Sequence, residues 1–393
     1  MILVLNCGSS SIKFALYPAA AAPLPRQPSW AGRVQGIGGP APEFRATGQG
    51  AEPVTLDATH PTTAALSLIL ARVEAHLEGR PLAAVAHRVV HGGGQYFAPV
   101  RVTQRVIDDL RRLIPLAPLH QPFPLKAMAI LLDRQPGLPQ IACFDTAFHR
   151  SLPMVEQLLP LPWSAWQNGL RRYGFHGLSY EYMSHALPER HGAPADGRVI
   201  VAHLGSGASL CAMEGRESIA STMGFSALDG LMMGTRTGAL DPGALLYLME
   251  IEGLSLDEVG QMLYRQSGLL GVSGLSDEPR VVVQHEDDPG EAGQRARLAL
   301  TLYVRRIVAE VGALMTALQG LDLLVFTAGV GENCAFIRSR VCAGLAFLGV
   351  ALDRVANDAN AAVISTPGSP IRVAVEPTNE EWITARHAQD LLA

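Results

Sequence analysis

The chain opens with a strand–turn–strand pattern that limits what it can fold into. Apolar residues run from Ile2 to Leu5, give way to small and polar residues at 6–11, and resume from Ile12 to Tyr17. Two short apolar runs around such a turn predict a β-hairpin. The turn offers backbone N–H groups, an amide, three hydroxyls and the Lys13 ammonium, which suit phosphate oxygens and a magnesium shell. It is not a P-loop, which opens a helix before Gly-Lys-Ser/Thr; a plain hairpin with a polar turn is the alternative.

Residues 199–213 repeat this layout. An apolar strand ends at His203, a turn follows at 205–207, and a second strand begins near Ser209, so that Asn6 aligns with His203. A third apolar strand ends in the glycine-rich residues 327–333, after which 334–345 predict a helix. Glycines let a backbone approach a ligand, and a helix N-terminus favours anions. The pattern predicts an internal duplication, two related domains facing one cleft, and nucleotide binding.

Length and charge narrow the class of protein. At 393 residues the chain can bury at least two cores, and its net charge of −5 with a pI near 6.2 gives no indication of a nucleic-acid or membrane-surface partner. The five cysteines lack paired spacing and predict buried, reduced thiols. The first apolar run is too short for a signal peptide, and polar residues interrupt the apolar stretch 311–330. We therefore expect a cytoplasmic protein that does not span a membrane.

Strands and helices alternate along the chain, which predicts an α/β protein with mixed sheets. Strands are expected at 83–90, 140–144 and 372–375, and irregular turns with short strands at 18–60. The apolar periodicity predicts helices at 62–77, 103–113, 125–132, 179–187, 255–266, 291–318 and 380–391. Ser179 is expected to cap one of them, and residues 255–258 form a capping-box pattern for another.

Charged and polar residues stand at the ends of apolar strands, where ligands tend to bind in α/β sheets. Arg88 sits in one such strand, Asp145 stands at the end of another, and Arg236 lies among glycines. Structural alternatives exist, because Arg88 could form an ordinary ion pair, and His120 and His176 could be hydrogen-bonded core residues. No Cys/His pattern indicates zinc.

Nine segments in register resemble the acetate and propionate kinase family. They span residues 2–381 and comprise residues 6–13, 87–93, 117–120, 144–149, 172–177, 230–238, 267–274, 326–333 and 377–381. That family belongs to the superfamily of actin, Hsp70 and hexokinase. The resemblance implies two duplicated ribonuclease-H-like domains with mixed sheets flanked by helices. We place the N-terminal domain at 1–148, with 380–393 returning to it as a helix, and the nucleotide-binding C-terminal domain at 149–379.

The resemblance also implies a reaction and its site. The family transfers a phosphoryl group between ATP and acetate, giving ADP and acetyl phosphate, usually with Mg²⁺ (Mn²⁺ is the alternative). Because both substrates are anions, placed cations must offset their repulsion. By position, the catalytic group comprises His120, Asp145, His176 and Arg236, and the substrate group Arg88, Val90, Leu119, Phe175 and Ala227. The nucleotide group comprises Lys13, His203, Gly205, Ser206, Gly207, Glu278, Arg280, Gly329, Gly331, Glu332 and Asn333. Asn6 and Glu380 match the metal site, with Glu380 acting through water.

Asp145 matches the residue that the family describes as an acid or base. An ordinary aspartate is already ionised at pH 7, and the acetate nucleophile has no proton to lose. Our hypothesis is that Asp145 orients an arginine or a magnesium-bound water. Phosphoryl transfer then depends on alignment and charge stabilisation.

Several positions depart from the family pattern. Ser206 replaces an asparagine in the nucleotide turn, Ala239 an aspartate after the arginine motif, and Ala227 a pocket proline. Gln121 replaces the asparagine after His120, and the sequence around Glu278 differs from the usual nucleoside motif. These changes predict an active enzyme with altered donor or acyl preference.

Three functions remain open on the sequence: an acetate kinase, a kinase for propionate, butyrate or another phosphoryl donor, and a weakly catalytic nucleotide switch like actin or Hsp70. Two arginines and two histidines favour the kinases, because a switch need not neutralise a second anion. The resemblance further implies a homodimer.

Overall fold

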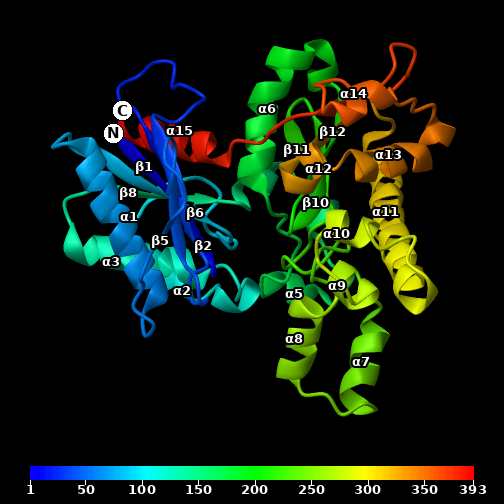
Figure 1. Cartoon of the computed structure of the whole chain (residues 1–393), viewed down its shortest axis with the longest axis horizontal. Coiled ribbons are helices and arrows are strands. Elements are labelled where there is room, and N and C mark those ends of the chain that lie inside the picture. The colour runs from blue at the N-terminus through cyan, green and yellow to red at the C-terminus, as the bar shows by residue number, and fades with distance from the viewer. The chain divides into compact units, whose positions relative to one another are not determined.

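A computed structural model describes residues 1–393, and the chain divides into two compact units (Figure 1). Unit 1 contains Met1–Phe148, Gly177–Tyr182 and Asn379–Ala393, whereas unit 2 contains His149–His176 and Met183–Thr378. Unit 1 therefore includes a third segment, Gly177–Tyr182, besides the N-terminal stretch and the returning C-terminal helix. No helix is long and apolar enough to cross a membrane.

Unit 1 is built on an eight-stranded mixed sheet in the order β5-β4-β3-β2-β1-β6-β8-β7. The expected hairpin is β1 and β2, joined antiparallel with Asn6 opposite Lys13. Strands β6 and β8 follow in parallel on the other side of β1. The bounds are β1 (Ile2–Cys7), β2 (Ser11–Tyr17), β3 (Trp30–Gln35), β4 (Glu43–Ala46), β5 (Glu52–Pro53), β6 (Ala84–Val89), β7 (Val100–Arg101) and β8 (Gln140–Phe144).

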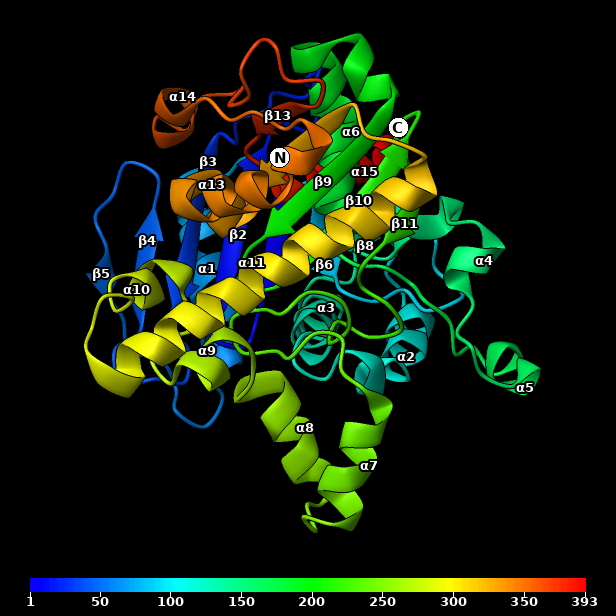
Figure 2. The same ribbon diagram turned by 90° about the vertical axis from the view of Figure 1, so that its right-hand side faces the viewer.

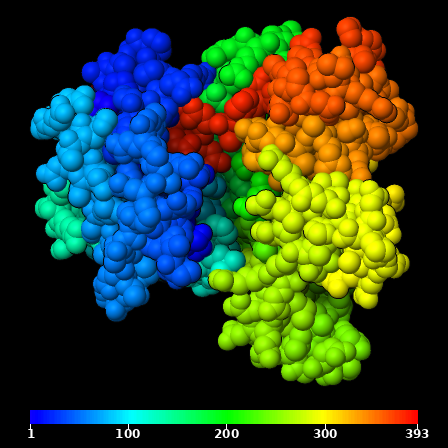
Figure 3. Space-filling view, viewed as in Figure 1, coloured from blue at the N-terminus to red at the C-terminus, as the bar shows by residue number.

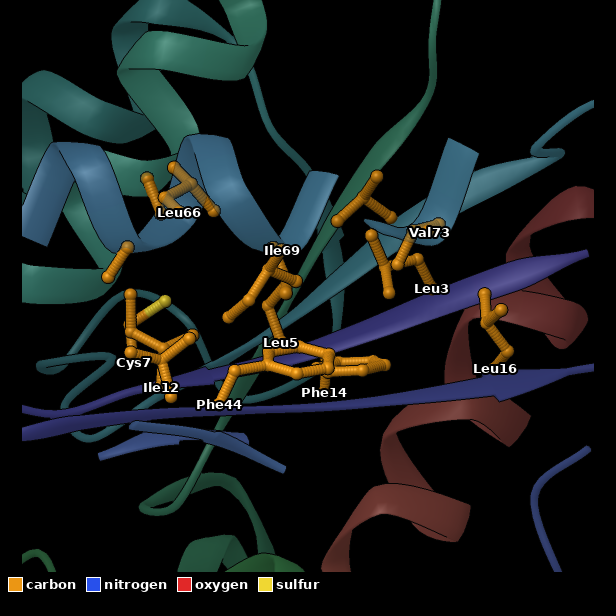
Figure 4. Close-up of a cluster of buried hydrophobic side chains, with 14 of the residues drawn as sticks. Leu3, Leu5, Cys7, Ile12, Phe14, Leu16, Phe44, Leu66, Ile69 and Val73 are labelled. Carbon is orange, nitrogen blue, oxygen red and sulfur yellow. The ribbon is translucent and has the colours of Figure 1, made fainter. Parts of the chain in front are cut away.

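Helices cover this sheet, because its central strands carry apolar residues on both faces. One core joins Leu3, Leu5 and Phe14 of the sheet to Leu66 and Ile69 of a helix (Figure 4). The C-terminal helix packs against β1, β6 and β8. Helical elements of unit 1 are α1 (Pro61–Leu77), α2 (Gln104–Arg111), η1 (Ile114–Leu116) and α3 (Pro122–Arg134), with η2 (Ala147–Ser151) at the exit from the unit and α15 (Glu380–Leu392) returning.

Unit 2 contains a five-stranded mixed sheet in the order β11-β10-β9-β12-β13. The bounds are β9 (Arg198–Leu204), β10 (Ala208–Glu214), β11 (Glu217–Ser221), β12 (Leu323–Thr327) and β13 (Arg372–Val375). Figure 2 shows the long helix α11 (Gly290–Leu318) crossing this sheet, and it contacts β9, β10 and β11. Helices α7 (Pro242–Glu250) and α8 (Leu256–Arg265) pack on each other and project from the rest of unit 2 (Figure 3).

The remaining helical segments of unit 2 are short, apart from α6, which begins in unit 1. They are α4 (Met154–Gln157), α5 (Trp163–Gln167), α6 (Gly177–His191), η3 (Ala193–Asp196), α9 (Gly268–Ser273), α10 (Pro279–Val283), α12 (Ala328–Asn333), α13 (Ala335–Gly344), η4 (Ala346–Leu348) and α14 (Arg354–Asp358).

The two sheets share one topology. In each, three antiparallel strands are followed across the first strand by two parallel strands, so β1, β2, β3, β6 and β8 correspond to β9, β10, β11, β12 and β13. The register agrees as well, because Asn6 pairs with Lys13 as His203 pairs with Ser209. The α/β class with two mixed sheets flanked by helices, expected from the sequence, is confirmed.

Local details confirm some expectations and correct others. The capping box of α8 is present, and all five cysteines are free and buried. The expectation that Ser179 caps a helix was wrong: α6 starts at Gly177, whose N–H donates to the Asp145 carbonyl, after His176 adopts a left-handed φ of 57°. The glycine-rich residues 328–333 are themselves helical, because the Glu332 carboxylate accepts the Ala328 N–H at 2.9 Å.

Candidate active site

In unit 1, three of the predicted residues form a compact ionic group, the Arg88 cluster, made of Arg88, Asp145 and Glu380. Arg88 follows the buried part of β6, Asp145 comes directly after β8, and Glu380 begins α15. Arg88 Nε and Nη2 donate to the Asp145 carboxylate at 3.1 and 2.7 Å, and Arg88 Nη1 lies 3.2 Å from Glu380 Oε2. The cluster is mostly shielded, with the Asp145 side chain only 2% exposed.

The pKa shifts in this cluster have two causes: burial, and the presence of two carboxylates beside one guanidinium. Burial alone would lower the pKa of Arg88, but Asp145 and Glu380 outweigh it and hold the pKa above its usual value. Burial raises the pKa of Asp145, while the charge and hydrogen bonds of Arg88 oppose that shift. Two carboxylates thus fix one guanidinium. Of its five N–H groups, the one on Nε and one on Nη2 donate to Asp145, while Nη1 forms an ion pair with Glu380.

The other predicted site residues of unit 1 lie on strands or in turns and are not part of the Arg88 cluster. Asn6 lies near the end of β1, and Lys13 pairs with it on β2. Val90 and Leu119 are half-buried, and His120 stands in the turn before α3, where its N–H donates to Ala117. Gln121 is fully buried and bonds the His91 backbone in both directions, which braces the turn after β6.

In unit 2, the predicted catalytic and nucleotide residues meet in a second group, the Arg236 cluster, made of His176, His203, Gly207 and Arg236. The rings of His176 and His203 stack with centroids 4.2 Å apart. A Cβ on Gly207 would lie 2.5 Å from Arg236 Nη2 and 3.3 Å from His176 Nε2. Glycine at this turn leaves room for the Arg236 and His176 side chains to approach the backbone.

Arg236 carries a buried charge that no carboxylate offsets. Its side chain donates through Nη1 to the Ala227 carbonyl at 2.6 Å, and only 8% of the residue is exposed. Burial lowers its pKa to about 10, so it remains a cation at neutral pH. An isolated buried cation is costly unless an anion pairs with it, which makes this group a candidate anion site.

Sequence reasoning missed Ser209, whose hydroxyl forms a 2.8 Å hydrogen bond with His176 Nδ1. This bond fixes the imidazole orientation and leaves Nε2 near Gly207. The internal repeat carried the signal, since Ser209 occupies the position in the second hairpin that Lys13 occupies in the first.

The remaining nucleotide candidates gather around α10 and α12. Arg280 Nη2 donates to the Asn333 carbonyl at 2.8 Å, which joins two predicted nucleotide segments. Glu332 is used internally, because its carboxylate accepts the N–H groups of Ala328 and Thr378. The structure therefore gives Glu332 a bracing role within its loop. The four predicted acyl-pocket residues divide between the units, with Phe175 and Ala227 buried in unit 2.

A duplicated mixed sheet with phosphate-compatible turns and two buried arginines, Arg88 and Arg236, is typical of α/β phosphotransferases. The model of the acetokinase family matches residues 1–386, and the chain belongs to that family. It is accordingly a phosphotransferase with a carboxyl group as acceptor.

Relatives and solved structures agree with this assignment. The chain is 48% identical to an acetate kinase of Rhodopseudomonas palustris (strain ATCC BAA-98 / CGA009), over 98% of this chain and 97% of the relative. It is 47% identical to an acetate kinase of Nitrobacter hamburgensis, over 100% and 96%. Porphyromonas gingivalis acetate kinase superposes with a TM-score of 0.86 at 36% identity, covering 100% and 99% of the two chains. A propionate kinase of Francisella tularensis superposes with a TM-score of 0.88 at 35% identity, covering 98% of each.

Proposed function

We propose that this protein transfers the γ-phosphoryl group of ATP reversibly to acetate. A carboxylate oxygen of acetate forms a bond to the γ-phosphorus while the bond from that phosphorus to the bridging oxygen of ADP breaks, giving acetyl phosphate and ADP. The observation that carries the proposal is the buried, unpaired Arg236 beside His176 and the glycine turn. Such donors stabilise the charge of a transferring phosphoryl group.

The Arg88 cluster is proposed to bind the acceptor acid. Asp145 fixes the guanidinium through hydrogen bonds from Nε and Nη2, so that its remaining N–H groups keep a constant direction in which they could bind a carboxylate. This is the arginine-orienting role predicted for Asp145, and it requires no proton transfer. The proposed acyl pocket of Val90, Leu119, Phe175 and Ala227 would take the methyl group.

Magnesium is proposed to bind through Asn6 and Glu380. The described residues contain no group of three or more His, Cys, Asp or Glu side chains able to hold a metal. An amide and a carboxylate already paired with Arg88 fit Mg²⁺, which keeps several waters and takes its other ligands from phosphates. The ion would neutralise phosphate charge; Mn²⁺ is the alternative.

The nucleotide would be held by four parts of the chain, namely Lys13, the 205–207 turn, Arg280 and the 329–333 segment.

A longer acid is the second candidate acceptor, because a solved relative is a propionate kinase and Ala227 is smaller than the proline usual at its position. One methylene in an apolar pocket changes the binding free energy by only about 1–3 kcal/mol. Preference must therefore be measured as a ratio of kcat/KM values.

A hydroxamate assay on the purified protein tests the proposal, with acetate, propionate and butyrate as acceptors and ATP, GTP and pyrophosphate as donors. We expect the highest kcat/KM with acetate and ATP. A higher value with propionate would replace acetate as the acceptor. ATP hydrolysis that no short acid changes would contradict the kinase and support a nucleotide switch. Size-exclusion chromatography with light scattering would test the proposed homodimer.

A further inference from the structure

The outer face of the unit 1 sheet carries a row of cations that the proposed reaction does not explain. Lys13 on β2 lies directly opposite Arg33 on β3, and Arg33 lies directly opposite Arg45 on β4. Like charges directly opposite each other on neighbouring strands are destabilising. Three in one row therefore oppose folding unless something else neutralises them.

The protein neutralises the row only in part, through Glu381, which lines the same groove and whose carboxylate interacts with the Lys13 ammonium. No salt bridge joins Lys13, Arg33 or Arg45 to a carboxylate. Arg33 Nε is buried and has no hydrogen-bond partner. Buried donors are nearly always paired in folded proteins, so this N–H is available to an acceptor such as water or a bound anion.

The same three side chains line a groove of about 490 Å³. The groove is hollow because the neighbouring residues on this face of the sheet have small side chains. They are Ala15, Ala31 opposite it, and Thr47. Tyr17 forms part of the wall, with its hydroxyl 3.5 Å from Asn379 Oδ1. A hollow of this volume is typical of small-molecule sites.

We propose that this groove binds a small polyanion, a molecule with at least two phosphate or carboxylate groups, through Arg33 and Arg45. Guanidinium groups bind either anion through paired, charge-assisted hydrogen bonds. The row continues through Lys13 to Asn6 on β1, residues that the proposed function assigns to the nucleotide and the metal. A bound polyanion would engage the Lys13 ammonium, which lines the same groove, and would thereby weaken nucleotide binding. Only this regulatory consequence depends on the proposed function; binding itself does not.

Isothermal titration of the full chain with inorganic tripolyphosphate, and separately with propane-1,2,3-tricarboxylate, tests the proposal. We expect Arg33→Gln and Arg45→Gln each to raise the Kd of at least one probe about tenfold, as expected for the loss of a charged hydrogen bond. Arg105→Gln is the matched control, because it removes an exposed unit 1 arginine outside the row and should leave the Kd unchanged. Whichever probe shows the difference identifies the anion class.

Thermal unfolding supplies a readout that needs neither ligand nor activity. Without added anions, Arg33→Gln and Arg45→Gln should raise Tm by about 1–3 °C by relieving repulsion, whereas Arg105→Gln should not. Equal Kd values for both probes in wild type, Arg33→Gln and Arg45→Gln would overturn the proposal, even if the kinase assay succeeded. If the variants had a raised Tm but bound both probes as tightly as wild type, the row would only destabilise the fold, and the proposal would also be overturned.

Discussion

The two units use the same sheet topology to hold an arginine in opposite electrostatic states. Arg88 in unit 1 is fixed between Asp145 and Glu380, whereas Arg236 in unit 2 is buried against a carbonyl with no carboxylate beside it. The pKa of Arg88 is accordingly raised, and that of Arg236 is lowered to about 10. The difference indicates that one arginine is kept in a set direction, while the other keeps its charge available for an anion.

The largest effect expected is on activity, where the two arginines should behave alike. Arg236→Met and Arg88→Met should each lower kcat/KM about 10²–10³-fold, the usual loss for one transition-state donor. Arg236→Lys should recover little, because an ammonium lacks the planar fork. Steady-state kinetics with acetate and ATP measure this. Near-normal kcat/KM in Arg236→Met would remove that residue from the proposed site.

Stability should separate the two arginines. Arg88→Met leaves Asp145 and Glu380 without their cation and should lower the free energy of unfolding by about 3 kcal/mol. Arg236→Met removes an unpaired buried charge and should be neutral or stabilising. Urea unfolding at pH 7 checks the pair. Equal destabilisation would mean that Arg236 has a counter-charge in solution and that the two arginines do not differ in electrostatic state.

Acid should destabilise unit 1 through a buried histidine. Burial lowers the pKa of His87 to about 4, its Nε2 bonds Gln140, and its Nδ1 has no partner. Between pH 6.5 and 4 the unfolded chain binds a proton that the folded chain does not, so stability falls as pH falls through this window, by up to about 3 kcal/mol. Urea midpoints at pH 7 and pH 5 measure the loss. His87→Gln should reduce the difference between the two midpoints; an unchanged difference would exclude His87 as its source.

The smallest effect expected concerns Ser209. Ser209→Ala removes the bond to His176 Nδ1 and should lower kcat about 5–10-fold, the equivalent of about 1 kcal/mol. Because the bond orients His176, a His176→Ala background should abolish the effect of Ser209→Ala. A full additional loss in the double variant would show that Ser209 acts independently of His176.

The same comparison explains which features could be predicted from the sequence. The duplication was readable because each hairpin is local, with Asn6 and His203 at matching strand ends. The ion pair between Arg88 and Asp145 remained only one of two alternatives, because residues 57 positions apart meet through sheet pairing. The stacking of His176 on His203 depends on the left-handed φ of His176, which no local pattern of apolar residues encodes.

The start of α6 was missed because its acceptor lies far away in sequence. A serine near a helix start predicts a cap, yet the carbonyl of Asp145, far away in sequence, supplies the acceptor for Gly177. At this helix start, a non-local acceptor replaced the expected local cap. The bonds that Glu332 accepts from Ala328 and Thr378 are a further contact that the glycine-rich pattern does not predict.

The return of α15 to the first sheet has a consequence for biosynthesis. Strands β1, β6 and β8 leave the ribosome long before Asn379–Ala393, the segment that packs on them and supplies Glu380. During translation that sheet face stays uncovered while all of unit 2 is made, so the nascent chain exposes an apolar surface that chaperones recognise. The segment Met1–Phe148, which is synthesised first, is thus among the last parts of the chain to complete its packing.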